Sequence, residues 1–415
     1  MSTNSGQDVS GDFPNPDTSM TSGPTFSEEH VMPSDAAVTA FQINTPKDDL
    51  DDLTARLAAT RWPDALPGVG WDYGVALPVL RDLVEYWRGD YDWRAHEQRL
   101  NALPQFITEI DGQQLHFVHI RSAEPNALPI LLTHGWPSTF ADFCGVVGPL
   151  TDPAGHGASY GPAFDVVIPS LPGYAYSGPT HEPGWNVTRI AGTLAALMRR
   201  LDYSRYLVQG GDFGSVISPA VARAAPDAVL GVHLNAMING ASVDWTRFEP
   251  LEDLSVEDIA SVEATEAWWR QRSGYAKLQS TRPQTLAYAL NDSPAGLLAW
   301  IADLEWAIGG DLEPGEVAVD RDEILTVATI YWLTHTAGSS IRLYTEHGDI
   351  YRDMAYNPTP TAVASFPRDN TLYALAERHH NLIRFTRYDR GGHFAALQAP
   401  DLLVDDIRAF TRQLT

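Results

Sequence analysis

The sequence predicts an α/β fold, with a mostly parallel sheet and helices on both of its faces. Short apolar runs alternate with helix-like segments between residues 129 and 234, and apolar runs return after residue 360. A run such as PILLT at 129–133 has no polar alternation, which is typical of a strand covered on both faces. Residues 240–352 interrupt this pattern with helical segments rich in Trp, Tyr and Ala.

The first hundred residues lie outside the α/β pattern. Residues 1–37 contain six acidic residues and no Lys or Arg, so we expect a disordered acidic tail. Leucines recur at helical spacing within residues 46–61, which predicts a helix. A stretch rich in Trp and Tyr follows, and we expect these side chains to fasten an N-terminal extension, residues 38–105, onto the core.

The remaining elements divide into three parts. We expect a first part of the α/β core at 106–239, a helical cap at 240–352 and a second part of the core at 353–415. An insertion between strands of an open sheet naturally covers the strand ends, where ligands bind. The expected elements of the core are a hairpin at 106–120, strands at 129–133, 164–169, 205–209, 229–234, 361–366 and 382–388, and helices at 187–201 and 400–414.

Composition excludes several classes of function. The net charge of −25 argues against binding to nucleic acid or to an anionic membrane surface. A single cysteine, Cys144, excludes an intrachain disulfide and favours a reducing cytoplasm. Neither a membrane-spanning apolar run nor a secretory signal is visible, so we expect a soluble cytoplasmic protein without a membrane anchor. No metal-ligand spacing occurs, and we expect neither a metal nor a cofactor.

The segment LVQGGDFGSV at 207–216 carries the strongest chemical signal. A sharp strand-to-helix turn that exposes a nucleophile needs small residues two positions before and two after it. Gly210 and Gly214 flank Asp212 at those spacings, so a carboxylate stands where a serine is usual. The alternative is an ordinary loop in which Asp212 caps the helix that follows.

Two further residues follow predicted strands in the order that this fold requires. Asp369 comes just after the strand at 361–366, and His393 comes just after the strand at 382–388. The order nucleophile, acid, histidine therefore selects Asp212, Asp369 and His393. Glu346 and Asp349 are weaker candidates for the acid because they precede a strand.

These residue types suit a two-step reaction. An aspartate is ionised at neutral pH, so Asp212 can attack an sp³ carbon and form an ester without a base. His393 would then take a proton from the water that cleaves the ester, while Asp369 orients the imidazole. The backbone N–H groups of Phe213 and Trp136 are expected to form the oxyanion hole. We expect no catalytic role for His134, the His379-His380 pair, which we place on an exposed helix surface, or Cys144, which we place in the core.

The chain resembles the microsomal-type epoxide hydrolases from about residue 40 onward. The resemblance rests on RLAATRWP, YWRGDYDWR, LLTHGWPST, PSLPGYAYS, QGGDFGS, SGYAKLQSTRPQTLAYALNDSP and RGGHFAALQAPDLL, among other segments. It implies an α/β-hydrolase fold with a helical cap and a helical N-terminal extension. It also places two epoxide-activating tyrosines at Tyr275 and Tyr344. Phe213 departs from the Trp of many members, and the polar tail replaces the membrane anchor of the mammalian ones.

The resemblance implies an enzyme that adds water to a small-molecule epoxide to give a vicinal diol. The composition of the expected cap suggests that this epoxide is apolar. A haloalkane dehalogenase uses the same aspartate chemistry and is the first alternative. The second is a catalytically silent α/β-hydrolase that binds a ligand, and in that case both tyrosines would be ordinary packing residues. The sequence leaves open whether the chain forms a homo-oligomer.

Overall fold

This computed structural model describes residues 37–157, 161–237, 254–305, 318–348, 355–369 and 371–414. The chain divides into two units, Met1–Ala36 and Ala37–Thr415, and every described residue belongs to the second. The expected acidic tail thus lies outside the described residues, apart from its last position. Within the described residues, no helix has both the length and the apolar composition needed to cross a membrane.

The described residues form a nine-stranded sheet with the order β1-β2-β3-β5-β4-β6-β7-β8-β9. The strands β1, β2, β3 and β5 pair antiparallel, and every pair from β5 through β4 to β9 is parallel. The predicted mostly parallel sheet is therefore confirmed. The strands are β1 (Thr39–Phe41), β2 (Gln105–Ile110), β3 (Gln113–Ile120), β4 (Leu128–Thr133), β5 (Phe164–Pro169), β6 (Tyr206–Asp212), β7 (Val229–Met237), β8 (Asn357–Ser365) and β9 (His380–Arg387).

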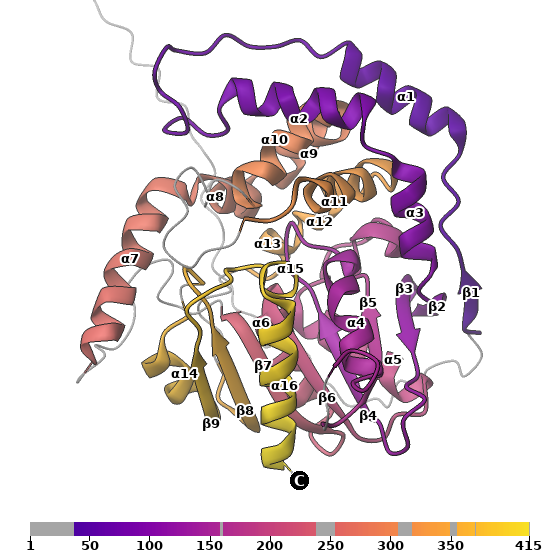
Figure 1. The fold of residues 1–415 in the computed structure, drawn as a ribbon, viewed down its shortest axis with the longest axis vertical. Coiled ribbons are helices and arrows are strands. Elements are labelled where there is room, and N and C mark those ends of the chain that lie inside the picture. Colours follow the sequence, from indigo (N-terminus) through magenta and orange to yellow (C-terminus); the bar gives the residue numbers. More distant parts are fainter. Residues whose placement is uncertain are drawn as a thin grey trace, which may run out of the picture. The chain divides into compact units, whose positions relative to one another are not determined.

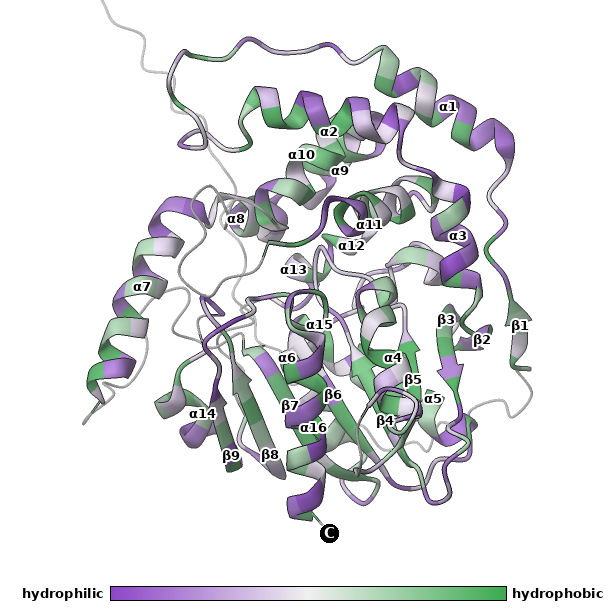
Figure 2. Cartoon of the chain, viewed as in Figure 1, coloured by the Kyte–Doolittle hydropathy of each residue, from purple (hydrophilic) through white to green (hydrophobic). Residues whose placement is uncertain are grey.

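Helices cover both faces of the sheet (Figure 1). One pair of packed helices is α4 (Cys144–Thr151) with α16 (Pro400–Leu414), and the other is α5 (Val187–Arg200) with α6 (Phe213–Ala224). The strands between them are largely hydrophobic, whereas α16 mixes hydrophilic and hydrophobic residues (Figure 2). Its buried side includes Leu403, Ile407 and Phe410, as expected for a helix with one face on a sheet. A short helix, α14 (Tyr373–His379), precedes β9.

The described residues between β7 and β8 are helical, as the sequence predicts. These cap helices are α7 (Val256–Arg272), α8 (Gly274–Thr281), α9 (Pro283–Asp292), α10 (Pro294–Glu305), α11 (Arg321–Leu333), α12 (Ala337–Ser340) and α13 (Leu343–Glu346). In Figure 1 most of them lie beyond one end of the strands. The exact domain boundaries given above stay predictions.

The N-terminal segment contributes α1 (Lys47–Ala58), α2 (Leu77–Gly89) and α3 (Trp93–Asn101), besides β1. Its aromatic side chains reach α11 of the cap helices. The Tyr86 hydroxyl donates to Asp322 at 2.8 Å, and the Trp87 indole N–H donates to the Thr329 hydroxyl at 2.9 Å. The sequence predicts that these aromatics fasten the segment, and the structure adds that α11 is a partner.

Candidate active site

Asp212 lies at the end of β6 in a backbone conformation that L-residues rarely adopt, with φ 54° and ψ −127°. The neighbouring chain comes too close for larger residues on either side. A Cβ on Gly210 would lie 2.3 Å from the Gly214 carbonyl oxygen, and a Cβ on Gly214 would lie 2.2 Å from that of Thr133. The small residues of the predicted turn are therefore a steric requirement of this geometry.

One oxygen of the Asp212 carboxylate accepts two backbone hydrogen bonds. Its Oδ1 atom accepts from the N–H of Trp136 at 2.9 Å and from the N–H of Phe213 at 2.7 Å. Trp136 follows β4, which pairs directly with β6, so the two N–H groups come from adjacent strand ends. Gly135 allows this approach, because a Cβ there would lie 2.2 Å from Oδ1. The structure thus brings together both N–H groups that the sequence selects for an oxyanion hole.

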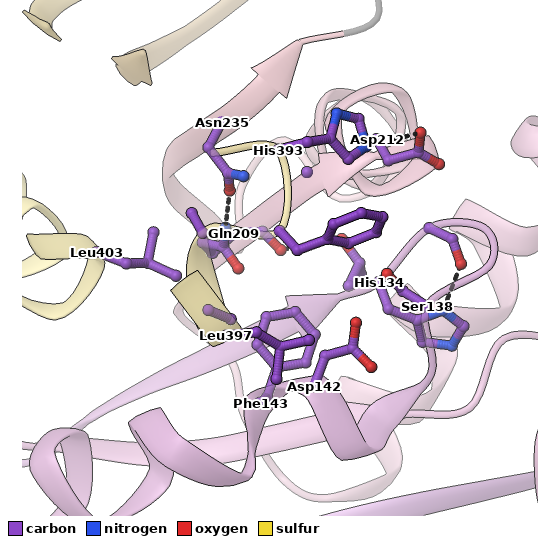
Figure 3. A pocket seen from close by; sticks show the side chains of 16 residues that line it. His134, Ser138, Asp142, Phe143, Gln209, Asp212, Asn235, His393, Leu397 and Leu403 are labelled. Carbon is purple, nitrogen blue, oxygen red and sulfur yellow. Dashed lines mark hydrogen bonds and ion pairs between the residues drawn. The ribbon is translucent and has the colours of Figure 1, made fainter. Parts of the chain in front are cut away.

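The other carboxylate oxygen lies near His393. The distance from His393 Nε2 to Asp212 Oδ2 is 3.4 Å, and the two side chains are 22% and 15% exposed. His393 follows β9, which lies beyond β7 and β8 from the strand β6 that carries Asp212, and it reaches Asp212 from a loop (Figure 3). A nitrogen base at this distance is close to the atoms where an ester on Asp212 would be cleaved.

Asp369 is buried in the turn after β8, where its carboxylate is held by the backbone. Oδ2 accepts from the Phe366 N–H at 2.7 Å, and Oδ1 accepts from the Thr371 N–H at 3.0 Å. Burial raises the pKa of Asp369, while these N–H groups and the nearby charge of His393 act in the opposite direction. The predicted acid therefore lies within electrostatic reach of the predicted histidine.

Tyr275 on α8 and Tyr344 on α13 meet over the ring of Trp136. The Tyr275 ring stacks on Trp136 with centroids 6.1 Å apart, and Tyr344 meets the same indole edge-on at 6.0 Å. Tyr344 also contacts Phe213, at 4.7 Å, and the two tyrosine rings are 6.1 Å apart. The cap helices thus place both predicted tyrosines against the two residues whose N–H groups hold Asp212.

A cavity of about 40 Å³ adjoins Asp212 and His393 on the side of the core (Figure 3). Two polar residues that the sequence analysis does not select, Gln209 and Asn235, also line it. The Gln209 Nε2 atom donates to Asn235 Oδ1 at 2.8 Å. The sequence feature that could have indicated them is the polar Gln209 within the apolar run that leads to the turn.

His134 and Asp142 line the same cavity but are engaged with the backbone. His134 Nδ1 lies 2.9 Å from the Gly135 carbonyl oxygen, and its Nε2 accepts from the Leu171 N–H at 3.2 Å. Burial lowers the pKa of His134 to about 4, so it is neutral and fixes the loop, in line with a structural role. Burial raises the pKa of Asp142 to about 7, although the Thr139 N–H donates to it.

The remaining residues that the sequence analysis weighs lie apart from Asp212 or outside the described residues. Glu346 accepts from the Gly184 N–H at 2.7 Å, a contact away from the Asp212 carboxylate, and Asp349 lies outside the described residues. The expected exposed helix surface at His379-His380 is wrong for His380, which is buried at the start of β9, where burial lowers its pKa to about 4. Cys144 is only half-buried, at the edge of the core.

No group of three or more His, Cys, Asp or Glu residues in the described part of the chain is arranged to hold a metal ion. A side chain in a sharp turn after a strand, with an acid and a histidine after later strands, is the arrangement found in α/β hydrolases. Residues 129–280 match the family model for the alpha/beta hydrolase fold. Residues 38–143 match the model for the epoxide hydrolase N terminus.

Relatives that match over most of the chain show which family within this class it belongs to. The chain is 41% identical to a putative epoxide hydrolase of Stigmatella aurantiaca, over 91% of this chain and 85% of that protein. It is 34% identical to epoxide hydrolase 1 of Sus scrofa, over 91% and 89% of the two chains. Among solved structures, Aspergillus niger epoxide hydrolase is 30% identical with a TM-score of 0.78, covering 92% of this chain and 99% of that chain. The chain belongs to the epoxide hydrolase family.

Proposed function

We propose that the protein adds water to an epoxide to give a vicinal diol through an ester on Asp212. The observation that carries this proposal is that the two oxygens of the Asp212 carboxylate have different partners. Oδ1 accepts the N–H groups of Trp136 and Phe213, whereas Oδ2 lies 3.4 Å from His393 Nε2. One oxygen is therefore held for a developing negative charge, and the other is the attacking atom.

In the first step, Asp212 Oδ2 attacks an epoxide carbon and the carbon–oxygen bond of the ring breaks. The ring oxygen leaves as an alkoxide, a strong base that needs a proton as it forms. A tyrosine hydroxyl is protonated at neutral pH and can donate to it. Tyr275 and Tyr344 meet over Trp136, beside the carboxylate, which supports their assignment as these donors.

In the second step, water attacks Cγ of the ester and gives a proton to His393 Nε2. The negative charge then develops on Oδ1, where the N–H groups of Trp136 and Phe213 stabilise it. The bond from Cγ to Oδ2 breaks, Oδ2 receives the proton held by His393, and the diol leaves with Oδ2. Asp369 orients His393 and stabilises its protonated form.

The same carboxylate could displace a halide, but the surrounding donors favour an epoxide. A departing halide needs no proton and is bound by weak N–H donors. The indole N–H of Trp136 is already engaged, because it donates to the Ser340 hydroxyl at 3.1 Å. The residue after the nucleophile is Phe213, which offers no side-chain donor.

The substrate that we propose is a small apolar epoxide. The tyrosine pair and the rings of Trp136 and Phe213 contact one another beside the nucleophile. Apolar walls with few polar groups are usual for small-molecule sites. Trp268 extends this wall, since its ring lies 6.3 Å from that of Tyr275. An epoxide with an apolar or aromatic substituent would bury that substituent against these rings.

Replacing His393 with Gln tests the two-step reaction. The variant should still be alkylated by an epoxide but should release the diol at least roughly 10²–10⁴-fold more slowly. Intact-protein mass spectrometry should then show a stable adduct with the mass of the epoxide. His181→Gln, which alters an exposed histidine, is the matched control and should turn over normally. Normal turnover by His393→Gln would contradict the assignment.

A further inference from the structure

Gln209 is a polar residue in a strand that is covered on both faces. The residue is only 1% exposed, and its neighbours in β6, Leu207 and Val208, are buried apolar residues. Burying an amide in such surroundings is unfavourable unless its polar atoms find partners. The position therefore calls for a physical reason.

The hydrogen bonds of Gln209 are incomplete. Its Nε2 atom donates to Asn235 Oδ1 at 2.8 Å, but its Oε1 atom has no partner among the described residues. Turning the amide over would only exchange the two atoms, so one polar terminus of Gln209 stays available in either orientation. A buried polar atom of this kind commonly binds an ordered water molecule.

The cavity beside Gln209 has room for such a molecule and reaches the reacting groups. Its volume of about 40 Å³ exceeds the 10–15 Å³ or so that one water needs. Gln209, Asp212 and His393 all line it (Figure 3). None of its lining residues belongs to the cap helices, so it meets Asp212 from the core, whereas Tyr275 and Tyr344 come from the cap.

We propose that Gln209 is a positioning residue for the water that cleaves the ester, an inference that rests on the proposed function. One hydrogen of this water donates to Gln209 Oε1, and the other donates to His393 Nε2. A lone pair of the water oxygen is thereby directed at Cγ of Asp212. As the new O–Cγ bond forms, His393 takes a proton from the water. The Cγ–Oδ2 bond then breaks, and Oδ2 receives this proton from His393, which releases the diol.

The replacement Gln209→Met tests this assignment, because it keeps the length of the side chain and removes its polar end. Rapid mixing with an excess of epoxide, followed by quenching and mass spectrometry, gives separate rates for ester formation and ester hydrolysis. We expect hydrolysis to slow by roughly 10-fold or more, the effect of one hydrogen bond, while ester formation stays nearly unchanged. The variant should consequently accumulate ester during turnover.

Two further variants make the result specific. Gln105→Met removes another buried glutamine, in β2 and outside the cavity, and should leave both rates nearly unchanged. Ala396→Val fills the cavity without removing a polar group and should slow hydrolysis selectively. If Gln209→Met does not fold, Ala396→Val alone tests whether a water in this cavity takes part in ester hydrolysis.

Equal slowing of both steps by Gln209→Met would indicate a structural role and would overturn the inference. Unchanged hydrolysis in Ala396→Val or in a folded Gln209→Met would overturn it as well. A parent protein that forms no ester at all would instead overturn the proposed function, and the inference with it.

Discussion

At the scale of the residue, Asp212 combines a strained backbone with a tightly held carboxylate. A non-glycine residue at φ 54° costs on the order of 1–3 kcal/mol. The hydrogen bonds from Trp136 and Phe213 to Oδ1 help to hold it there. In this conformation the other oxygen, Oδ2, lies 3.4 Å from His393 Nε2.

The tyrosine pair yields a prediction at this scale. Phe at Tyr275 and at Tyr344 keeps the ring contacts and removes only the proton donor, so ester formation should slow while the free energy of unfolding barely changes. The double variant should lose roughly 10²–10⁴-fold in the pre-steady-state rate of alkylation. Tyr373→Phe, whose hydroxyl donates to Glu377, is the control and should react like the parent. Undiminished alkylation in the double variant would contradict the assignment of an epoxide as the substrate.

The candidate site residues could be predicted from the sequence because, in this fold, they follow the ends of strands. Asp212, Asp369 and His393 each come directly after an apolar run, and the parallel sheet brings those ends to one edge. Gln209 was not selected from the sequence, because a single polar residue within an apolar run still fits the pattern of a buried strand. The hydrogen bond of Gln209 joins it to Asn235, which is 26 positions away in the sequence but lies on the next strand of the sheet.

At the scale of the element, α16 is tied to the sheet by a buried carboxylate. Asp406 is fully buried, accepts from the guanidinium of Arg384 on β9 at 2.7 Å, and lies 3.2 Å from His233 on β7. Burial alone would raise the pKa of Asp406, but hydrogen bonds from His233 and Arg384 outweigh it and lower that pKa well below 3.8. The charged form therefore stabilises the fold.

Asp406→Asn should cost about 3–5 kcal/mol of the free energy of unfolding at pH 7, because Arg384 loses its buried partner. A lowered carboxylate pKa contributes stability above the unfolded pKa, and that contribution is lost as the pH falls through the folded value. The difference between variant and parent should therefore shrink below about pH 4. Urea unfolding across pH measures it. Asp405→Asn, at a 75% exposed neighbour, is the control; a constant difference at all pH values would contradict this account.

Elements were predictable where the apolar pattern was strong, as in the continuous runs of β4 and β6 and the helical spacing of α16. The three-residue β1 is too short to carry such a pattern, and only its pairing with β2 defines it. The placement of His380 failed for a related reason. The strand β9 begins before its apolar run, so this residue is buried by pairing with Asn357 on β8.

At the scale of the whole described unit, the N-terminal helices are joined to the cap. Arg99 on α3 pairs with Glu323 on α11 at 2.6 Å, and the Arg321 guanidinium lies 3.6 Å from the centre of the Tyr86 ring. Trp87 is 4% exposed and adds its hydrogen bond to Thr329. These contacts place α2 and α3 against the helix that carries Glu323 and Thr329.

Trp87→Ala should lower the free energy of unfolding by about 3–5 kcal/mol, the range for removing a large buried aromatic side chain. Denaturant unfolding measures the loss. Tyr73→Ala removes an aromatic side chain from the same segment, but one that is 77% exposed, and should change stability by less than about 0.5 kcal/mol. Equal effects of the two substitutions would argue against a packing role for Trp87.

The partner of these aromatics could not be chosen from the sequence. Apolar periodicity shows that a helix buries one face, but it does not say against which element. The segment that contains Trp87 and the helix α11 are separated by more than two hundred residues, and only the folded chain brings them together. The same limit applies to the aromatic contacts among Trp136, Tyr275 and Tyr344.

A single turnover in water labelled with heavy oxygen tests the central claim, that Asp212 is the covalent nucleophile. With enzyme in excess over epoxide, the oxygen added to the diol should come from the Asp212 carboxylate and carry no label. The label should instead appear in the peptide that contains Asp212, and reach the diol only in later turnovers. Labelled diol in the first turnover, with an unlabelled Asp212 peptide, would mean that water attacks the epoxide directly and would contradict the covalent mechanism.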